Sequence, residues 1–194
     1  METFRGTLDL PLNEKGKEQA GKLAVAFTRH EPVAVYSSPL VRAIDTADGI
    51  AEPHLLPVLQ EYRFIDLDFG QWQGKLVSEV KKLYPDTYRE WRKNPYHAKI
   101  PGGGDISKLA KNAYDALLEI AERHKNDEVI IVTHRLVLKL LICSALGMGE
   151  SGFWKIRLDC GSISLLEYTG KNFILSLLND TCHLDSTTSK PVDF

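Results

Sequence analysis

A histidine and an arginine separate two apolar segments in the stretch EVIIVTHRLVLKLLI (128–142). The run Val129–Val132 predicts a buried strand, and residues 136–146 predict a helix that is apolar on nearly every side. His134 and Arg135 therefore lie where the strand ends and the helix begins. An imidazole and a guanidinium at this point could bind an anion or move a proton.

A second junction of the same kind precedes Arg42. The segment PVAVY (32–36) predicts a short buried strand, and Ser38 and Pro39 are typical of an N-cap and a first helical residue. A cation in the first turn of a helix opposes the helix dipole, and a bound dianion such as a phosphoryl group would remove that conflict. The alternatives remain open that Arg42 is an exposed surface residue and that His134 is a hydrogen-bonded core histidine.

The elements that must position these residues alternate between strand and helix along the chain. This order, with apolar strands of four to six residues, predicts an α/β fold with a mostly parallel sheet flanked by helices on both faces. Ligands in such folds bind beyond the carboxyl ends of the strands. The remaining expected elements are a helix capped by Asn13 and ending near Arg29, a helix from Ser38 to about Ala51, one or two helices over 77–94 broken at Pro85, a helix capped by Ser107 and ending near His124, and two strands at 162–168 and 173–179.

The composition excludes several classes of protein. With 194 residues, 43% apolar residues and a formal net charge of −2, the chain gives no indication of binding nucleic acid or a membrane surface. No apolar segment predicts a membrane span or a signal peptide, and three cysteines without CxxC spacing indicate a reduced, cytoplasmic protein. We expect one domain over 1–184, with an excursion over the pocket at 62–106, and a polar C-terminal tail at 185–194.

Several segments together resemble the histidine phosphatase superfamily, which has the phosphoglycerate mutase-like fold. The similarity covers nearly the whole chain in the family's order and favours its phosphatase branch. It is carried by FRGTLDLPLNEKGKEQA (4–20), YSSPLVRAIDTA (36–47), FIDLDFGQWQG (64–74), VTHRLVLKLL (132–141), FWKIRLDCGSISLLEY (153–168) and NDTCHL (179–184). The resemblance implies a phosphomonoesterase that acts on a small phosphorylated metabolite through a phosphohistidine, with no metal and no cofactor.

The resemblance also implies roles for individual residues. Arg42 matches an arginine that clamps the phosphoryl oxygens, and His134 matches a second histidine that bonds the phosphate. Asp66 falls where the family has an acid that protonates the leaving alkoxide, which requires a raised pKa. Its neighbour Asp68 competes for that role.

Substrate contacts are less closely matched. Arg5 resembles a substrate-pocket residue, and Arg135 stands where the family has a small residue, so Arg135 either reaches the substrate or is solvated. PGGGD (101–105) replaces a segment that normally reads Gly-Glu-Ser.

The family's signature, Arg-His-Gly at the end of a central first strand, is absent from this chain. Three hypotheses follow: a truncation or miscalled start, a pseudoenzyme that binds phosphate esters without hydrolysing them, or a partner segment that fills the gap, for instance in a swapped homodimer. A metal hydrolase that uses His134, Asp66 and His183 is a further alternative, although the chain has no HExxH, HxH or CxxC spacing.

Overall fold

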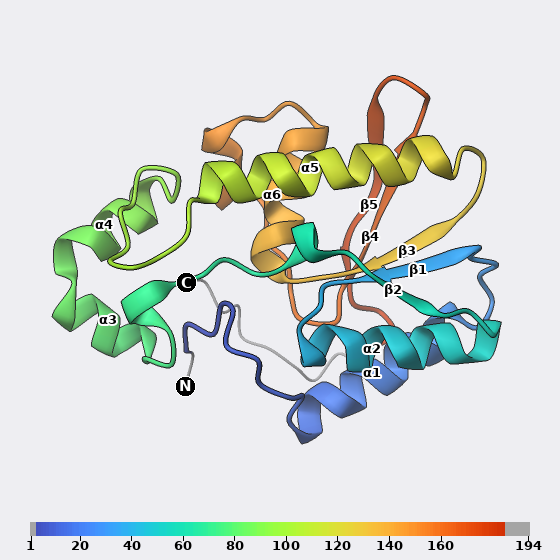
Figure 1. The fold of residues 1–194 in the computed structure, drawn as a ribbon, viewed down its shortest axis with the longest axis horizontal. Helices are drawn as coiled ribbons and strands as arrows, with labels where there is room; N and C mark the ends of the chain where they lie inside the picture. The colour runs from blue at the N-terminus through green and yellow to red at the C-terminus, as the bar shows by residue number, and fades with distance from the viewer. Residues whose placement is uncertain (1–2, 185–194) are drawn as a thin grey trace.

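The computed structural model describes residues 3–184 of the chain, and Figure 1 shows its arrangement. Three parallel strands form one sheet in the order β2-β1-β3, and two antiparallel strands form a second. The predicted tail at 185–194 lies outside the described residues. The strands are β1 (Ala34–Ser37), β2 (Val58–Gln60), β3 (Val129–Val132), β4 (Ile163–Tyr168) and β5 (Phe173–Asp180).

Six α-helices and four short 3₁₀ helices connect and cover the strands in the described part of the chain. None of the helices within residues 3–184 is long and apolar enough to cross a membrane. The α-helices are α1 (Glu14–Phe27), α2 (Val41–Ala51), α3 (Val77–Leu83), α4 (Pro85–Lys93), α5 (Ile106–Arg123) and α6 (Arg135–Ala145), and the 3₁₀ helices are η1 (Glu52–His54), η2 (Tyr62–Phe64), η3 (Gly70–Trp72) and η4 (Glu150–Lys155).

Strand β1 is buried throughout and directs alternate side chains to two helical layers. Tyr36 packs in a cluster with Ala113 of α5 and Val137 of α6. Val35 packs on the other side with Leu23 of α1 and Ile50 of α2. Helices therefore cover both faces of the parallel sheet (Figure 1), which confirms the predicted fold class.

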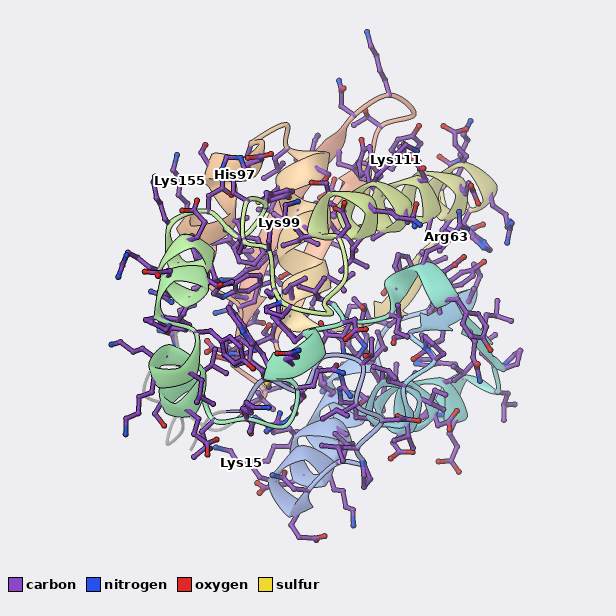
Figure 2. The ribbon with its side chains drawn as sticks, turned by 60° about the vertical axis from the view of Figure 1, so that its left-hand side comes forward. Lys15, Arg63, His97, Lys99, Lys111 and Lys155 are labelled. Carbon is purple, nitrogen blue, oxygen red and sulfur yellow. The ribbon has the colours of Figure 1, made fainter. Side chains whose placement is uncertain are left out.

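Two groups of contacts are prominent among those that tie residues 62–106 to the rest of the fold. An aromatic cluster anchors one part, in which the rings of Phe4 and Trp72 are 5.1 Å apart and Trp91 packs against Trp72. In the other group, Arg63 of η2, which is labelled in Figure 2, forms ion pairs with Glu61 and with Glu119 of α5. The loop between η2 and η3 begins near the carboxyl end of β3, where Oγ1 of Thr133 donates to the carbonyl oxygen of Phe64.

The edge of β3 opposite β1 has no ladder partner among residues 3–184. Strand β3 pairs only with β1, and β4 pairs only with β5. Side chains from β4 and β5 nevertheless join the clusters on both faces of β3: Leu166 lies in the cluster that contains Ile131, and Ile163 lies in the cluster that contains Ile130. Ile131 is only half-buried, although every residue of β1 is buried.

Two predicted helix caps are wrong, and one is confirmed. Asn13 caps α1, because its Oδ1 atom accepts a hydrogen bond from the Gly16 amide. Helix α2 begins at Val41 rather than at Pro39, and the Val41 amide donates to Oδ1 of Asp9 at 2.7 Å. The carboxylate of Asp9, from a distant loop, therefore has the capping role that the sequence pattern predicted for Ser38.

At α5 the predicted cap is displaced by two residues. Asp105, not Ser107, is the N-cap residue, and its Oδ1 atom accepts hydrogen bonds from the amides of Ser107 and Lys108. Strand β2 was not predicted. The predicted break of the 77–94 helices at Pro85 is confirmed by α3 and α4.

Candidate active site

Arg42 lies in the first turn of α2, and its side chain is largely buried. Its Nη1 donates to the carbonyl oxygen of Leu8 at 2.8 Å, and its Nη2 donates to that of Gly6 at 2.7 Å. Nη2 also lies 3.3 Å from Oδ2 of Asp66. Among residues 3–184, these contacts use three of the five guanidinium N–H groups and leave Nε–H and one Nη1–H for a ligand.

Asp66 lies in the loop between η2 and η3 and faces both Arg42 and His134. Its Oδ1 accepts a hydrogen bond from the Leu67 amide at 2.9 Å, and its Oδ2 is 3.9 Å from Nδ1 of His134. Burial raises the pKa of the Asp66 carboxyl, and the charge of Arg42 acts in the opposite direction. A carboxyl group that holds its proton above the usual range can act as a general acid.

His134 is the residue before α6 and is 8% exposed. Its Nε2 lies 2.7 Å from Oγ of Ser38, and both side chains are buried. Burial, together with the charge of Arg42, lowers the pKa of His134 to about 3. The imidazole is therefore neutral at physiological pH and carries a single N–H group.

Arg5 and Arg135 lie close enough to influence this cluster. The positive charge of Arg5, which is exposed, contributes to lowering the pKa of Arg42. The charge of Arg135 contributes to lowering the pKa of Asp66. Arg42 beside a carboxyl group and a neutral imidazole, with the positive charges of Arg5 and Arg135 acting on the same groups, suits a doubly charged phosphate ester.

Other candidate residues lie elsewhere. Oδ1 of the exposed Asp68 accepts a hydrogen bond from the Gly70 amide, so Asp68 stabilises its own loop. Nε2 of His183 bonds the carbonyl oxygen of Gly161 rather than approaching Asp66. Within residues 3–184, no group of three or more His, Cys, Asp or Glu side chains is arranged to hold a metal ion.

The chain has six histidines, and His134 alone contacts Asp66. His30 and His97 are exposed and face glutamates. His54 is only partly exposed, because its Nε2 bonds the Phe27 carbonyl oxygen. The described residues therefore supply one histidine to the cluster.

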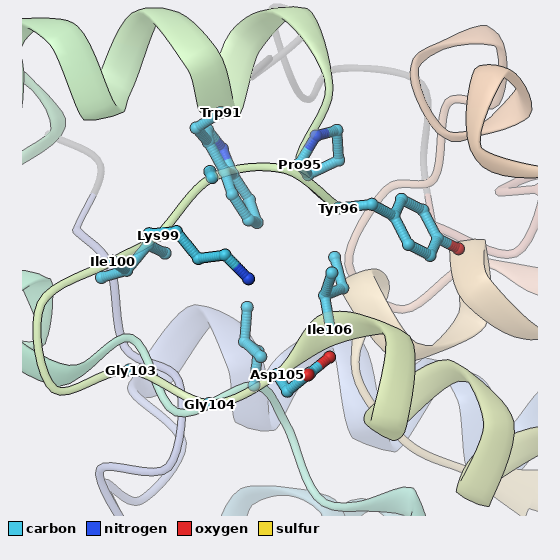
Figure 3. A pocket seen from close by; sticks show the side chains of 11 residues that line it. Trp91, Pro95, Tyr96, Lys99, Ile100, Gly103, Gly104, Asp105 and Ile106 are labelled. Carbon is cyan, nitrogen blue, oxygen red and sulfur yellow. The ribbon is translucent and has the colours of Figure 1, made fainter.

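The loop PGGGD packs directly against η3. Gly70 has a φ of 47°, and a Cβ atom there would lie 2.4 Å from the backbone of Gly102 and Gly103. Beside this contact, the excursion encloses a cavity of about 150 Å³ that Leu67 and Trp91 line (Figure 3). Lys99 extends toward its centre. Its lining does not include Arg42, Asp66 or His134, so it is separate from the cluster.

The contact of Ser38 with His134 was not predicted from the sequence. Ser37 pairs with Val132 across the two parallel strands. The residues just beyond, Ser38 and His134, therefore leave neighbouring strand ends at similar levels, and this register could have indicated the contact.

Comparison with known proteins identifies relatives along most of the chain. A family model described as histidine phosphatase superfamily (branch 1) matches residues 1–181. Phosphoserine phosphatase 1 of Hydrogenobacter thermophilus is 36% identical over 93% of this chain and 86% of its own length. A metal-independent phosphoserine phosphatase of Arabidopsis thaliana is 33% identical over 94% of this chain and 76% of its own length. The solved structure of Bacillus stearothermophilus YhfR superposes with a TM-score of 0.87 at 28% identity, covering 93% of this chain and 90% of that one.

Proposed function

Because the chain belongs to the histidine phosphatase superfamily (branch 1), we propose that it is a phosphomonoesterase that hydrolyses a small phosphorylated metabolite. The observation that carries this proposal is the direct contact of Asp66 with both Arg42 and His134. Arg42 binds the phosphoryl oxygens, His134 donates a hydrogen bond to them, and Asp66 gives its proton to the leaving alkoxide.

Phosphoserine is the first substrate to test, because two of the relatives are phosphoserine phosphatases. Its phosphoryl group would lie against Arg42. Its carboxylate would pair with Arg5 or Arg135, whose positive charges lower the pKa values of Arg42 and Asp66, respectively.

The phosphohistidine route needs a nucleophilic histidine besides His134. A nitrogen of that histidine attacks phosphorus, the ester P–O bond breaks, and the alkoxide takes the proton of Asp66. Water then attacks the phosphohistidine and gives a proton to the Asp66 carboxylate, which releases inorganic phosphate. We assign the nucleophile to a further strand that the described residues do not contain. This strand would end in Arg-His-Gly and pair with the open edge of β3.

Three observations support a strand at that edge. It has no ladder partner in the described part of the chain, Ile131 is less buried than any residue of β1, and β4 shares the clusters on both faces of β3 without pairing to it. Additional sequence of the same polypeptide or a second copy in a swapped homodimer could supply the strand.

The alternative function is a phosphate-ester binder without turnover. It is favoured by the absence of Arg-His-Gly from these 194 residues. Binding would still use Arg42 and His134, so the alternatives differ in catalysis and not in the ligand.

The test compares the 194-residue chain with an extended chain, in which an apolar strand ending in Arg-His-Gly is joined before Met1. Phosphate release from phosphoserine and p-nitrophenyl phosphate is measured with EDTA present, and inorganic phosphate binding is measured by thermal melting. We expect both chains to bind phosphate and the extended chain to hydrolyse both esters. The matched control replaces the added histidine by alanine and should bind without turnover.

Each other outcome is decisive. Failure of both chains to bind phosphate contradicts the phosphatase assignment. Binding by both without turnover establishes the binder. Equal turnover by both chains places the nucleophile within the 194 residues.

A further inference from the structure

Ser38 and His134 form a buried pair at the ends of two neighbouring parallel strands. Ser38 directly follows β1, and His134 lies two residues after β3. Ser38 has no exposed surface, and its Oγ is 2.7 Å from Nε2 of His134. Since Ser38 is inaccessible to substrate in this arrangement, it would act on a reaction through the groups that it contacts, and the shortest of these side-chain contacts is the one with His134.

The contacts of Ser38 determine which of the two groups donates. A neutral imidazole can either donate from Nε2–H to the hydroxyl oxygen or accept the hydroxyl proton at Nε2. The other contact of Oγ among the described residues is the amide of Leu40, at 3.4 Å, and an amide N–H can only donate. Nε2 is therefore the available acceptor for the buried hydroxyl proton, which would otherwise have no partner.

If Nε2 accepts, the single ring proton of His134 resides on Nδ1. That atom faces Oδ2 of Asp66 at 3.9 Å, and the same oxygen lies 3.3 Å from Arg42. A proton on Nδ1 makes the ring a donor toward phosphoryl oxygens bound there. A proton on Nε2 would instead direct the Nδ1 lone pair at an anion, which is repulsive.

We propose that Ser38 is a positioning residue that fixes His134 in the Nδ1–H tautomer and so makes it a hydrogen-bond donor to a bound phosphoryl group. The tautomer follows from the contacts of the folded chain, whereas its use in hydrolysis rests on the proposed function. Ser38 thus couples the end of β1 to the imidazole at the end of β3.

The experiment records long-range ¹H–¹⁵N correlation spectra of the 194-residue chain with ¹⁵N-labelled histidine. The His134 signals are identified by their loss in His134→Gln. We expect Nδ1 to be protonated and Nε2 unprotonated, and we expect inorganic phosphate to shift the Nδ1 signal. In Ser38→Ala the single tautomer should give way to a mixture.

Ser37→Ala is the matched control. Ser37 is also fully buried, but its Oγ donates to the carbonyl oxygen of Ser38 and does not contact His134. The control loses a buried hydroxyl of the same size and should keep the wild-type tautomer. Ser38→Cys, which retains a weak donor, should restore part of the Nδ1–H population.

A wild-type proton on Nε2, or the same spectrum in Ser38→Ala and Ser37→Ala, would overturn the proposal. In the extended chain we also expect Ser38→Ala to lower kcat about tenfold relative to Ser37→Ala, the scale of one lost hydrogen bond. Equal kcat values in these two variants would show that the tautomer is not used in hydrolysis. If the spectra agree but no variant hydrolyses any ester, the proposed function fails and the positioning of His134 by Ser38 stands.

Discussion

Nη2 of Arg42 lies 3.3 Å from Oδ2 of Asp66, yet the pKa of this carboxyl group is raised. A neighbouring cation alone would lower the pKa, so burial outweighs the charge of Arg42. The carboxyl group is held close to Arg42 and His134, the residues proposed to bind phosphate, while its proton is retained more strongly than in water. This balance suits a proton donor to a leaving group, and it makes the role of Asp66 testable.

Asp66→Asn in the extended chain should lower kcat on phosphoserine by about 10²-fold, the scale of a lost general acid. The loss on p-nitrophenyl phosphate should be much smaller, because p-nitrophenolate leaves without being protonated. Steady-state phosphate release measures both. The control is Asp68→Asn, which removes an exposed loop carboxylate two residues away. Equal losses on the two substrates would show that Asp66 does not act as the acid.

Arg42→Ala should abolish the phosphate-dependent rise in melting temperature of the 194-residue chain. In the extended chain it should reduce kcat at least about 10²-fold. It should also destabilise the ligand-free protein by on the order of 2 kcal/mol, because the carbonyl oxygens of Gly6 and Leu8 lose charge-assisted hydrogen bonds.

The control for Arg42→Ala is Arg89→Ala. It removes the same charge from an exposed ion pair with Asp86 on α4, where a surface pair contributes about 0–1 kcal/mol. If Arg89→Ala weakens phosphate binding as much as Arg42→Ala does, the effect comes from net charge and not from the clamp.

The sequence predicted those features that depend on neighbouring residues. The apolar run at β3, the break at Pro85 and the Asn13 cap all follow from residues within one or two turns, and all are present. Strand β2 was missed because it has three residues, none of them buried, so it lacks the apolar pattern of an interior strand.

The site was predicted incompletely for a different reason. Arg42, Asp66 and His134 were identified and do lie together, but their partners come from distant segments. Asp9 caps α2 from 32 residues away, and Ser38 meets His134 across 96 residues. Local propensity favoured Ser38 as a helix cap, and the pairing of β1 with β3 placed its hydroxyl group against the imidazole instead.

The pH dependence of stability should report the burial of His134. Its pKa falls from 6.5 to about 3 on folding, so the unfolded chain binds a proton between these values while the folded chain does not. The contribution of neutral, buried His134 to the free energy of unfolding is therefore fully present above pH 6.5 and is lost as the pH falls toward 3. Relative to His134→Gln, the free energy of unfolding should drop by about 2 kcal/mol between pH 7 and pH 5.

Urea unfolding at several pH values measures this difference. The contribution of Asp66 to stability has the opposite pH dependence, because a raised pKa stabilises the fold as the pH falls. Asp66 is present in both proteins, so its contribution largely cancels in the comparison. His30→Gln, which removes an exposed histidine, is the control and should not change the low-pH loss by a comparable amount. Parallel pH curves for the wild type and His134→Gln would show that His134 is not buried in its neutral form.

Amide hydrogen exchange should reveal the open edge of β3. The carbonyl oxygen of Val132 accepts from the Ser38 amide, so Val132 faces β1 and the neighbouring Ile131 directs its amide to the other edge. In the 194-residue chain the Ile131 amide should exchange much faster than that of Val35 in the central strand. In the extended chain the Ile131 amide should be protected at least about tenfold, while that of Val35 changes little.

The control is the extended chain with proline at the centre of the added strand, since proline cannot donate to a ladder. If the Ile131 amide exchanges as slowly in the 194-residue chain as in the extended chain, no strand is missing from this edge.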